Sequence, residues 1–378
     1  MQTESKNSPG GVLVYVGTYT DPILFGSGEV FQGRGEGIYI YSMDRSTGGM
    51  TLVNTVRGVT NPSYLAFDPS GRFAYAVNEL KEYEGKASGS VSSFAVEQDG
   101  HNLRFLNKQP TGGTDPCHVV VDRWGKHLFV ANFMSGSVSV YPRRPDGSIG
   151  PATHFIQHTG SGHIPKRQAG PHAHSTVLDH ENRYAFIPDL GLDRLMIYRY
   201  DGQRGMLRPN ETPWVQTKPG AGPRHLALHP SRPFAYLINE LDSTIGAYRY
   251  DGASGSFELL ETVSTLPAGY TGASTCADIN VDPLGDFLYG SNRGHDSVVI
   301  FRIDGATGRL AYVGHESTRG KVPRNFAIDP AGRFLLAANQ NTDTIEVFAI
   351  DRSSGKLSHT GNSVMVPTPV CVRFRPEQ

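Results

Sequence analysis

One segment of the chain, Asn61–Asn78, recurs along the sequence, and this repetition constrains the fold more than any other feature. A fixed period of this kind is typical of repeat architectures, in which each copy is one supersecondary unit. Aligning the copies on a shared Asp-x-x-x-Arg turn gives seven equivalent anchor positions, 46 to 57 residues apart: Pro62, Pro116, Ala173, Pro223, Cys276, Pro323 and Pro369.

Every copy has the same internal order of strands and turns. An apolar strand leads into a turn such as Asp68–Gly71, and the next strand alternates large and small residues, as in Phe73–Val77. A third strand, an Asp-x-x-x-Gly turn and a fourth strand follow, as in Ile245–Tyr248, Asp251–Gly255 and Phe257–Val263. Period-two patterning bounded by Gly, Pro and Asp indicates strands and hairpins, and no stretch sustains a helical period. Four strands in about 50 residues, repeated, predict an all-β β-propeller with four-stranded antiparallel blades.

The two ends of the chain supply complementary parts of one blade. Pro369–Phe374 provides only a first strand before the sequence stops. Val12–Tyr19, Gly37–Met43 and Met50–Val56 provide a second, third and fourth strand at the other end. Pairing these segments completes a seventh blade and closes the ring, which leaves no open sheet edge. We therefore predict a seven-bladed propeller.

Charge and hydropathy exclude several classes of partner. The chain has 35 Lys and Arg against 36 Asp and Glu, and its adjacent basic pairs, Arg143–Arg144 and Lys166–Arg167, are too few for a nucleic-acid stripe. No apolar run approaches the ~20 residues that cross a bilayer. We expect neither a nucleic-acid nor a membrane partner. A disordered tail at residues 1–10 should precede a single domain at residues 11–378 that is a monomer or a weak homo-oligomer.

The cysteines point to a compartment. Cys117, Cys276 and Cys371 are odd in number, widely spaced and without a CxxC pair. Such thiols are most simply kept reduced, and residues 1–10 contain no stretch that resembles a signal peptide. The expected location is therefore cytoplasmic.

Propeller geometry gathers certain positions on one rim. The first strand of a blade lines the central channel and the second runs antiparallel to it, so the start of the first and the end of the second share a face. The ionisable residues at these positions differ from blade to blade, so the repeat itself does not require them. They are His174, Arg224 and Arg324, one residue past their anchors, and Glu240 and Arg293, at the ends of second strands. A proton carrier, a carboxylate and three fixed positive charges suit an anionic substrate that undergoes proton transfer.

Several rim residues also have a purely structural interpretation. Asn and Asp residues that recur at second-strand ends commonly close turns, and Arg224 and Glu240 could form a structural salt bridge. Histidines near the strand starts could line the wall without taking part in chemistry. With these alternatives open, the candidate substrate-binding residues are Arg324, His118, His225, Asn339, Glu79 and His172.

Other chemical sites find little support. The histidines between His154 and His174 have no compact ligand spacing and no cysteine partner, so we predict no metal and no other cofactor. Gly26–Gly37 is rich in glycine but lacks the strand-to-helix context of a phosphate-binding loop, and we expect a mobile loop over one face. The absence of a Gly-x-Ser-x-Gly elbow argues against an α/β-hydrolase.

Short segments along nearly the whole chain, from about Val12 to Phe374, resemble one known family. It is the seven-bladed lactonase family, which includes bacterial propeller-type 6-phosphogluconolactonases and fungal carboxy-cis,cis-muconate lactonizing enzymes. The segments that carry the resemblance are Val16–Thr20, Gly170–Ser175, Gly220–His225, Tyr236–Leu241, Ala277–Ile279 and Ser291–Arg293.

The resemblance implies a site as well as a fold. It implies that His174, Arg224, Glu240 and Arg293 are catalytic, and that Arg324 is a further arginine at the substrate. Two long inserts, residues 21–36 and 80–89, depart from the short connections usual in the family. Because both leave second strands on the expected active face, they leave the size and chemistry of the substrate open.

We therefore expect metal-independent hydrolysis of a small anionic sugar-acid lactone, with 6-phosphogluconolactone opened to 6-phosphogluconate. Glu240 would activate water as a general base, His174 would protonate the leaving ring oxygen, and the arginines would hold the oxyanion or the anionic group. One alternative is a lactonizing enzyme (cycloisomerase) or a lactonase for a non-phosphorylated acid, since ring opening and ring closing share a transition state. Another is a propeller that binds a ligand or protein without catalysis.

Overall fold

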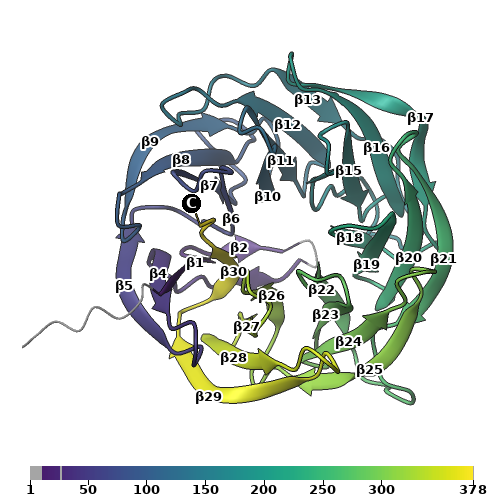
Figure 1. The fold of residues 1–378 in the computed structure, drawn as a ribbon. Coiled ribbons are helices and arrows are strands. Elements are labelled where there is room, and N and C mark those ends of the chain that lie inside the picture. The colour runs from purple at the N-terminus through teal and green to yellow at the C-terminus, as the bar shows by residue number, and fades with distance from the viewer. Residues whose placement is uncertain (1–10, 26–27, 378) are drawn as a thin grey trace, which may run out of the picture.

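The computed structural model describes residues 11–25 and 28–377, so the predicted tail at residues 1–10 lies outside the described residues. Seven four-stranded antiparallel sheets surround a central axis (Figure 1), which confirms the seven-bladed propeller. No helix within the described ranges is long and apolar enough to cross a membrane.

The blades follow one another around the ring in chain order, each with its first strand innermost. Blade 1 consists of β6 (Tyr64–Phe67), β7 (Phe73–Asn78), β8 (Ser90–Val96) and β9 (Leu103–Pro110). Blade 2 consists of β10 (Pro116–Val121), β11 (His127–Asn132), β12 (Ser137–Pro142) and β13 (His154–Gln157). Blade 3 consists of β14 (Val177–Leu178), β15 (Tyr184–Asp189), β16 (Arg194–Asp201) and β17 (Met206–Gln216).

The remaining blades have the same organisation. Blade 4 consists of β18 (Pro223–Leu228), β19 (Phe234–Asn239), β20 (Thr244–Asp251) and β21 (Ser256–Ser264). Blade 5 consists of β22 (Thr275–Val281), β23 (Phe287–Arg293), β24 (Ser297–Ile303) and β25 (Leu310–Ser317). Blade 6 consists of β26 (Pro323–Ile328), β27 (Phe334–Asn339), β28 (Thr344–Ile350) and β29 (Leu357–Met365). Blade 7 consists of β30 (Pro369–Phe374), β1 (Val12–Thr18), β4 (Gly37–Met43) and β5 (Met50–Arg57).

Blade 7 closes the ring as the sequence predicted. Strand β30, from the end of the chain, pairs antiparallel with β1, and Val16 lies opposite Val372 in this ladder. β1 in turn pairs with β4, so its backbone groups are satisfied on both sides. The pairing of the two chain ends removes the edge that an open ring would expose.

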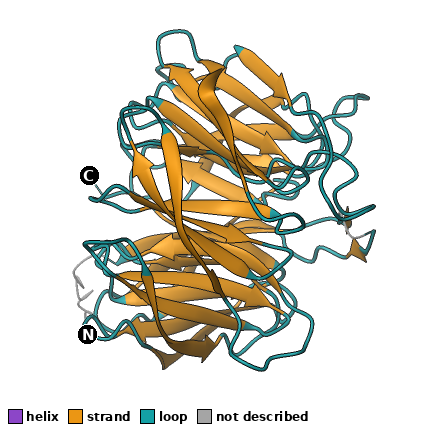
Figure 2. Ribbon diagram, turned by 90° about the vertical axis from the view of Figure 1, so that its right-hand side faces the viewer, coloured by secondary structure: helices purple, strands orange, loops and turns teal. Residues whose placement is uncertain are grey.

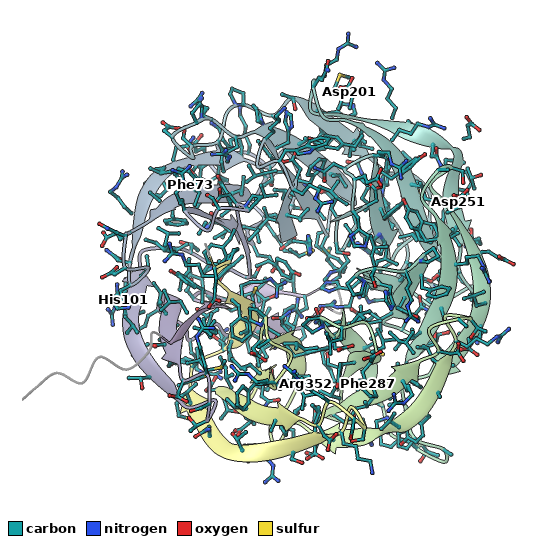
Figure 3. The ribbon with its side chains drawn as sticks, in the orientation of Figure 1. Phe73, His101, Asp201, Asp251, Phe287 and Arg352 are labelled. Carbon is teal, nitrogen blue, oxygen red and sulfur yellow. The ribbon has the colours of Figure 1, made fainter. Side chains whose placement is uncertain are left out.

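The core is divided among the interfaces between blades. Side chains from both faces of each sheet are buried, which explains the alternation of large and small residues along the second strands. Between blades 1 and 2, for example, Tyr75 and Val77 pack with Val119, Leu128 and Val130. Figure 3 shows side chains filling the spaces between the ribbons, with Asp251, the last residue of β20, at the periphery of the ring.

Most innermost strands begin with a β-bulge. In β10, Pro116 pairs with Asn132 and His118 with Ala131, which leaves Cys117 between them without a partner in the ladder. The same shift leaves Arg224 unpaired in β18 and Arg324 unpaired in β26. A bulge interrupts the alternation of side-chain direction and re-aims the extra residue. Two successive residues of an innermost strand can therefore both face the channel.

The first long insert contains a hairpin where the sequence suggested a mobile loop. Strands β2 (Ile23–Leu24) and β3 (Val30–Phe31) pair antiparallel. The rings of Phe25 and Phe31 stack at 5.5 Å, and both lie about 6 Å from the ring of Tyr19. The hairpin projects from the face of the ring that is opposite the C-terminal end (Figure 2). Aromatic packing on the buried Tyr19 anchors these described residues.

Candidate active site

A cavity of about 440 Å³ opens at the channel mouth beneath the hairpin, with Phe25 and Phe31 in its wall. The structure brings into this single cavity all four residues predicted as catalytic, together with two of those predicted to bind substrate. These six lining residues are His174, Arg224, Glu240, Arg293, Arg324 and Glu79. They come from five different blades, so only the closed ring assembles them.

The bulges and strand ends aim these side chains. Arg224 and Arg324 are bulged residues at the starts of β18 and β26. Glu240 directly follows β19, and its backbone N–H donates to the carbonyl of Gly222 at 2.7 Å. Arg293 ends β23 and pairs in the ladder with Thr275. The backbone therefore holds each functional side chain on a rigid strand end.

Glu240 is the centre of a cluster of arginines. Its Oε2 accepts from Arg224 Nη1 at 2.6 Å and contacts Arg293 Nη2 at 2.9 Å. Its Oε1 accepts from Arg167 Nη2 at 2.7 Å. Burial by itself raises the pKa of Glu240, but the positive charges of Arg293, Arg224 and Arg167 outweigh it and hold that pKa well below its usual range. The carboxylate is ionised and a weak proton acceptor.

His174 lies against this cluster as a neutral imidazole. Its Nε2 contacts Nη1 of Arg224, and its Nδ1 lies 3.8 Å from Sγ of Cys117. Burial and then the charge of Arg224 hold the pKa of His174 well below its usual range. The edge of the Phe133 ring packs against His174, at 5.2 Å between centroids. Near neutral pH this histidine carries no charge.

Arg324 has a different environment from the other arginines. Its guanidinium lies over the rings of Tyr19 and Phe25, at 5.5 and 5.4 Å from their centroids. Within residues 11–25 and 28–377 it forms no ion pair with a carboxylate. Cation–π contacts attract the charge without neutralising it. Arg324 is therefore available to an anionic ligand.

Two further carboxyl groups line the opposite side of the cavity. Glu79, after the end of β7, accepts from the Tyr19 hydroxyl at 3.1 Å, and burial raises its pKa. Asp115, just before β10, is also buried. Burial and then the charge of Glu79 raise the pKa of Asp115 to about 7. Both carboxyl groups therefore have a higher proton affinity than Glu240.

The structure does not bring the remaining predicted residues into this cavity. His118 and His225 line a second cavity of about 410 Å³, whose wall reaches Arg123 and Asn182 at the other end of the innermost strands. The Asn339 amide donates to the carbonyl of Thr318, at 2.8 Å, and so closes a turn. The bulge explains the separation of His118 and His225 from the site, since each follows a bulged residue that faces the first cavity.

His172 lies behind the wall of the first cavity rather than in it. Its ring stacks on Phe133 at 4.7 Å, and its Nδ1 is 3.0 Å from the Phe133 carbonyl oxygen. The guanidinium of Arg167 lies over the same phenyl ring, 5.4 Å from its centroid. His172 therefore supports Phe133, which in turn supports Arg167.

Sequence reasoning missed two functional candidates. Arg167 was noticed only as part of a basic pair, because it lies in a connection between blades outside the repeat pattern. Asp115 lies one residue before the anchor Pro116, whereas the predicted rim positions at strand starts all follow their anchors. An ionisable residue at that position, where blade 1 has Asn61, was the available signal.

The cavity is lined by guanidinium groups, carboxyl groups and a histidine that do not form a set of metal ligands. In the part of the chain that the structure describes, no group of three or more His, Cys, Asp or Glu is placed to hold a metal ion. Glu240, the most ionised carboxylate at the cavity, already has three arginine partners.

Comparison with known proteins agrees with this fold. A family described as lactonase, 7-bladed beta-propeller, matches residues 13–374. A 6-phosphogluconolactonase of Bacillus subtilis is 35% identical over 95% of this chain and 97% of its own length. One of Formosa agariphila is 34% identical over 83% and 85%. The solved structure of a periplasmic gluconolactonase from Pseudomonas aeruginosa is 35% identical, with a TM-score of 0.88 over 96% of this chain and 99% of that one. The chain therefore belongs to the family of seven-bladed β-propeller lactonases.

Proposed function

We propose that this protein hydrolyses a sugar-acid lactone and that its substrate is 6-phosphogluconolactone, which it opens to 6-phosphogluconate. The observation that carries the proposal is Arg324, a buried cation at the cavity with no carboxylate partner among the described residues. A phosphate group carries about −1.5 to −2 charge near pH 7 and would neutralise it. The names of the relatives from Bacillus subtilis and Formosa agariphila support the same substrate.

The other arginines suit the oxyanion that forms when water attacks the lactone carbonyl. Nε of Arg293 and Nη1 of Arg167 are buried donors without an acceptor among the described side chains. Buried donors usually have partners, and charge-assisted bonds to oxyanions are among the stronger hydrogen bonds. Glu240 holds these guanidinium groups in place before substrate arrives. Donors that are already oriented stabilise developing charge without reorganising.

The roles predicted for Glu240 and His174 stay predictions, and their contacts favour other roles. Each oxygen of Glu240 already accepts a bond from an arginine, and its low pKa makes it a poor base. His174 is neutral and in contact with Arg224 through Nε2, so it has no extra proton to give the ring oxygen. Both residues fit a role in orienting the arginines around the substrate.

A non-phosphorylated lactone is the second candidate. The relative from Pseudomonas aeruginosa, named a gluconolactonase, is as similar to this chain as the relative from Bacillus subtilis is. If the substrate is the phosphorylated lactone, we expect the protein in the cytoplasm, because a multiply charged ester does not cross a bilayer unaided. A lactonizing enzyme would use the same cavity in the reverse direction.

Acid release from matched lactones tests the proposal. The purified protein should hydrolyse 6-phosphogluconolactone with kcat/KM at least about 10-fold above that for gluconolactone, after subtraction of spontaneous hydrolysis. Arg324→Met should remove this preference by raising KM for the phosphorylated substrate. Arg123→Met, which removes a positive charge from the second cavity, should leave the preference intact. Equal or faster hydrolysis of gluconolactone by the wild type would contradict the phosphorylated substrate.

A further inference from the structure

The active cavity has two walls of opposite character. On one side Arg167, Arg224 and Arg293 surround Glu240. On the other side Glu79 and Asp115 approach from blades 1 and 2. The carboxyl groups of this second wall have no arginine within ion-pair distance among the described residues. The cavity therefore offers a substrate both guanidinium groups that can stabilise negative charge and carboxyl groups that can accept a proton.

The backbone holds Asp115 firmly at the cavity. Its N–H donates to the carbonyl of Leu80, the residue after Glu79, at 2.9 Å, and its carbonyl accepts from the N–H of Phe133 at 2.9 Å. Its φ of 52° lies in the left-handed region, which Asp tolerates better than most residues. These bonds place Asp115 beside Glu79 and next to Phe133, which also lines the cavity.

The carboxyl group of Asp115, unlike that of Glu240, has no arginine partner. Asp115 is 2% exposed, yet its Oδ2 has no hydrogen-bond donor among the described residues. The nearest cation is Lys81, whose Nζ lies 3.7 Å from this oxygen. Buried carboxylates normally accept several hydrogen bonds. Asp115 also lines the cavity, and no hydrogen bond from a described side chain commits its carboxylate, so this group is suited to accept a proton from water there.

Glu79 assists this function through its charge and its position. The Tyr19 hydroxyl donates a hydrogen bond to Glu79, and the guanidinium of Arg324 lies over the Tyr19 ring. Its negative charge beside Asp115 disfavours a second ionised carboxylate there, which increases the proton affinity of Asp115. A base whose pKa lies near the working pH is both available and effective.

We propose that Asp115 is the general base that activates water in this cavity, with Glu79 as its positioning residue and Glu240 as the anchor of the arginines. The inference rests on the proposed lactone hydrolysis. Asp115 takes one proton from water as the water oxygen bonds to the carbonyl carbon, and the carbonyl electron pair moves to the oxygen, which the arginines stabilise. The oxyanion then collapses, the bond from the carbonyl carbon to the ring oxygen breaks, and the ring oxygen takes the proton from Asp115.

The pH dependence of kcat in three variants tests the assignment. In the wild type, kcat should rise through a pH of about 7 as Asp115 loses its proton. Asp115→Asn should lower kcat by about 10²- to 10⁴-fold and abolish this rise, while KM changes little. Glu240→Gln should instead raise KM and keep the rise. Asp286→Asn, the same change on an exposed turn, should match the wild type.

A binding measurement separates loss of catalysis from loss of structure. Asp115→Asn should bind 6-phosphogluconate, the expected product, within about 3-fold of the wild-type Kd, because the arginine wall is intact. A folded Asp115→Asn variant with wild-type kcat, or one that keeps the rise near pH 7, would overturn the assignment and leave the lactonase proposal standing. A wild-type protein that hydrolyses no sugar-acid lactone would overturn the proposed function and the base together.

Discussion

Nη1 of Arg224 lies 2.6 Å from Oε2 of Glu240, so an ion pair inside the candidate active cavity joins the start of β18 to the end of β19. Both side chains are almost fully buried. Removing two charges from water is costly, and a buried pair persists only where geometry and further hydrogen bonds compensate. Here Arg167 and Arg293 complete the shell of the carboxylate. The salt bridge that the sequence left as an alternative to function is thus also a part of the site.

Glu240→Gln should destabilise the fold at neutral pH but not in acid. The pKa of Glu240 is depressed in the folded state, so its charge contributes stability that is present above the ordinary glutamate pKa and is lost as the pH falls toward the folded value. Breaking a buried ion pair costs roughly 3–5 kcal/mol. The midpoint of urea unfolding should fall in the variant at pH 7, and the difference should narrow below a pH of about 4.

The exposed pair of Arg249 and Glu258 provides the control for this prediction. Glu258→Gln should change the midpoint only slightly at either pH, because exposed ion pairs contribute little. An unchanged midpoint for Glu240→Gln at pH 7 would contradict the view that this carboxylate anchors the arginines.

Asp115→Asn should have the opposite effect on stability. The pKa of Asp115 is raised to about 7 in the folded state, so the folded protein binds this proton more tightly than the unfolded chain does. Stability from this group therefore falls as the pH rises from about 4 to about 7. Thermal unfolding at pH 8 should give a higher Tm for the variant than for the wild type, and the difference should nearly vanish at a pH of about 4. A lower Tm at both values would show that the Asp115 carboxylate stabilises the fold.

Loss of β30 should open the ring. A chain ending at Met365 lacks Pro369–Phe374 and exposes the edge of β1, whose inward residues Val14 and Val16 lie in the core with blade 6. Unpaired strand edges promote aggregation. Analytical size exclusion and thermal unfolding should show aggregates without a cooperative transition. Removal of residues 376–378 alone should preserve both the monodisperse elution profile and the melt, since β30 remains.

Hydrolysis should survive exhaustive treatment with EDTA. In the proposed reaction the guanidinium groups of Arg167 and Arg293 polarise the carbonyl, a role that a Lewis-acidic metal takes in other enzymes. The measurement is the rate of acid release before and after chelation and dialysis into metal-free buffer. Loss of activity that calcium or zinc restores would show that a metal ion takes part and would contradict this role of the arginines.

Replacement of Phe25 should weaken substrate binding through Arg324. The phenyl ring supports the guanidinium at 5.4 Å, and Phe25→Leu keeps an apolar side chain while removing the cation–π contact. Such contacts contribute about 0.5–2 kcal/mol, so KM for the phosphorylated lactone should rise by a few-fold to about 30-fold while kcat changes less. Phe105→Leu, at an exposed position on β9, should leave both constants unchanged. A loss confined to kcat would contradict the role given to this ring.

Sequence patterning was enough to predict the blades, their number and the closure of the ring. These features follow from the local strand and turn pattern and from its period of about 50 residues, because each blade packs against its neighbours in the same way. It also placed Arg224, Glu240 and Arg293 on a common rim, because strand direction follows from the order of strands in a blade. That part of the site was predictable.

Which rim residues share a cavity, and which of them are ionised, depends on the tertiary structure. Because of the bulge in β18, Arg224 lines one cavity and its neighbour His225 lines the other. A bulge depends on the pairing of two strands rather than on residue type. Arg167 reaches Glu240 from a connection that follows no repeat. Whether Asp115 or Glu240 holds a proton depends on burial and on every charge nearby, because desolvation and Coulomb attraction act through space and not along the chain.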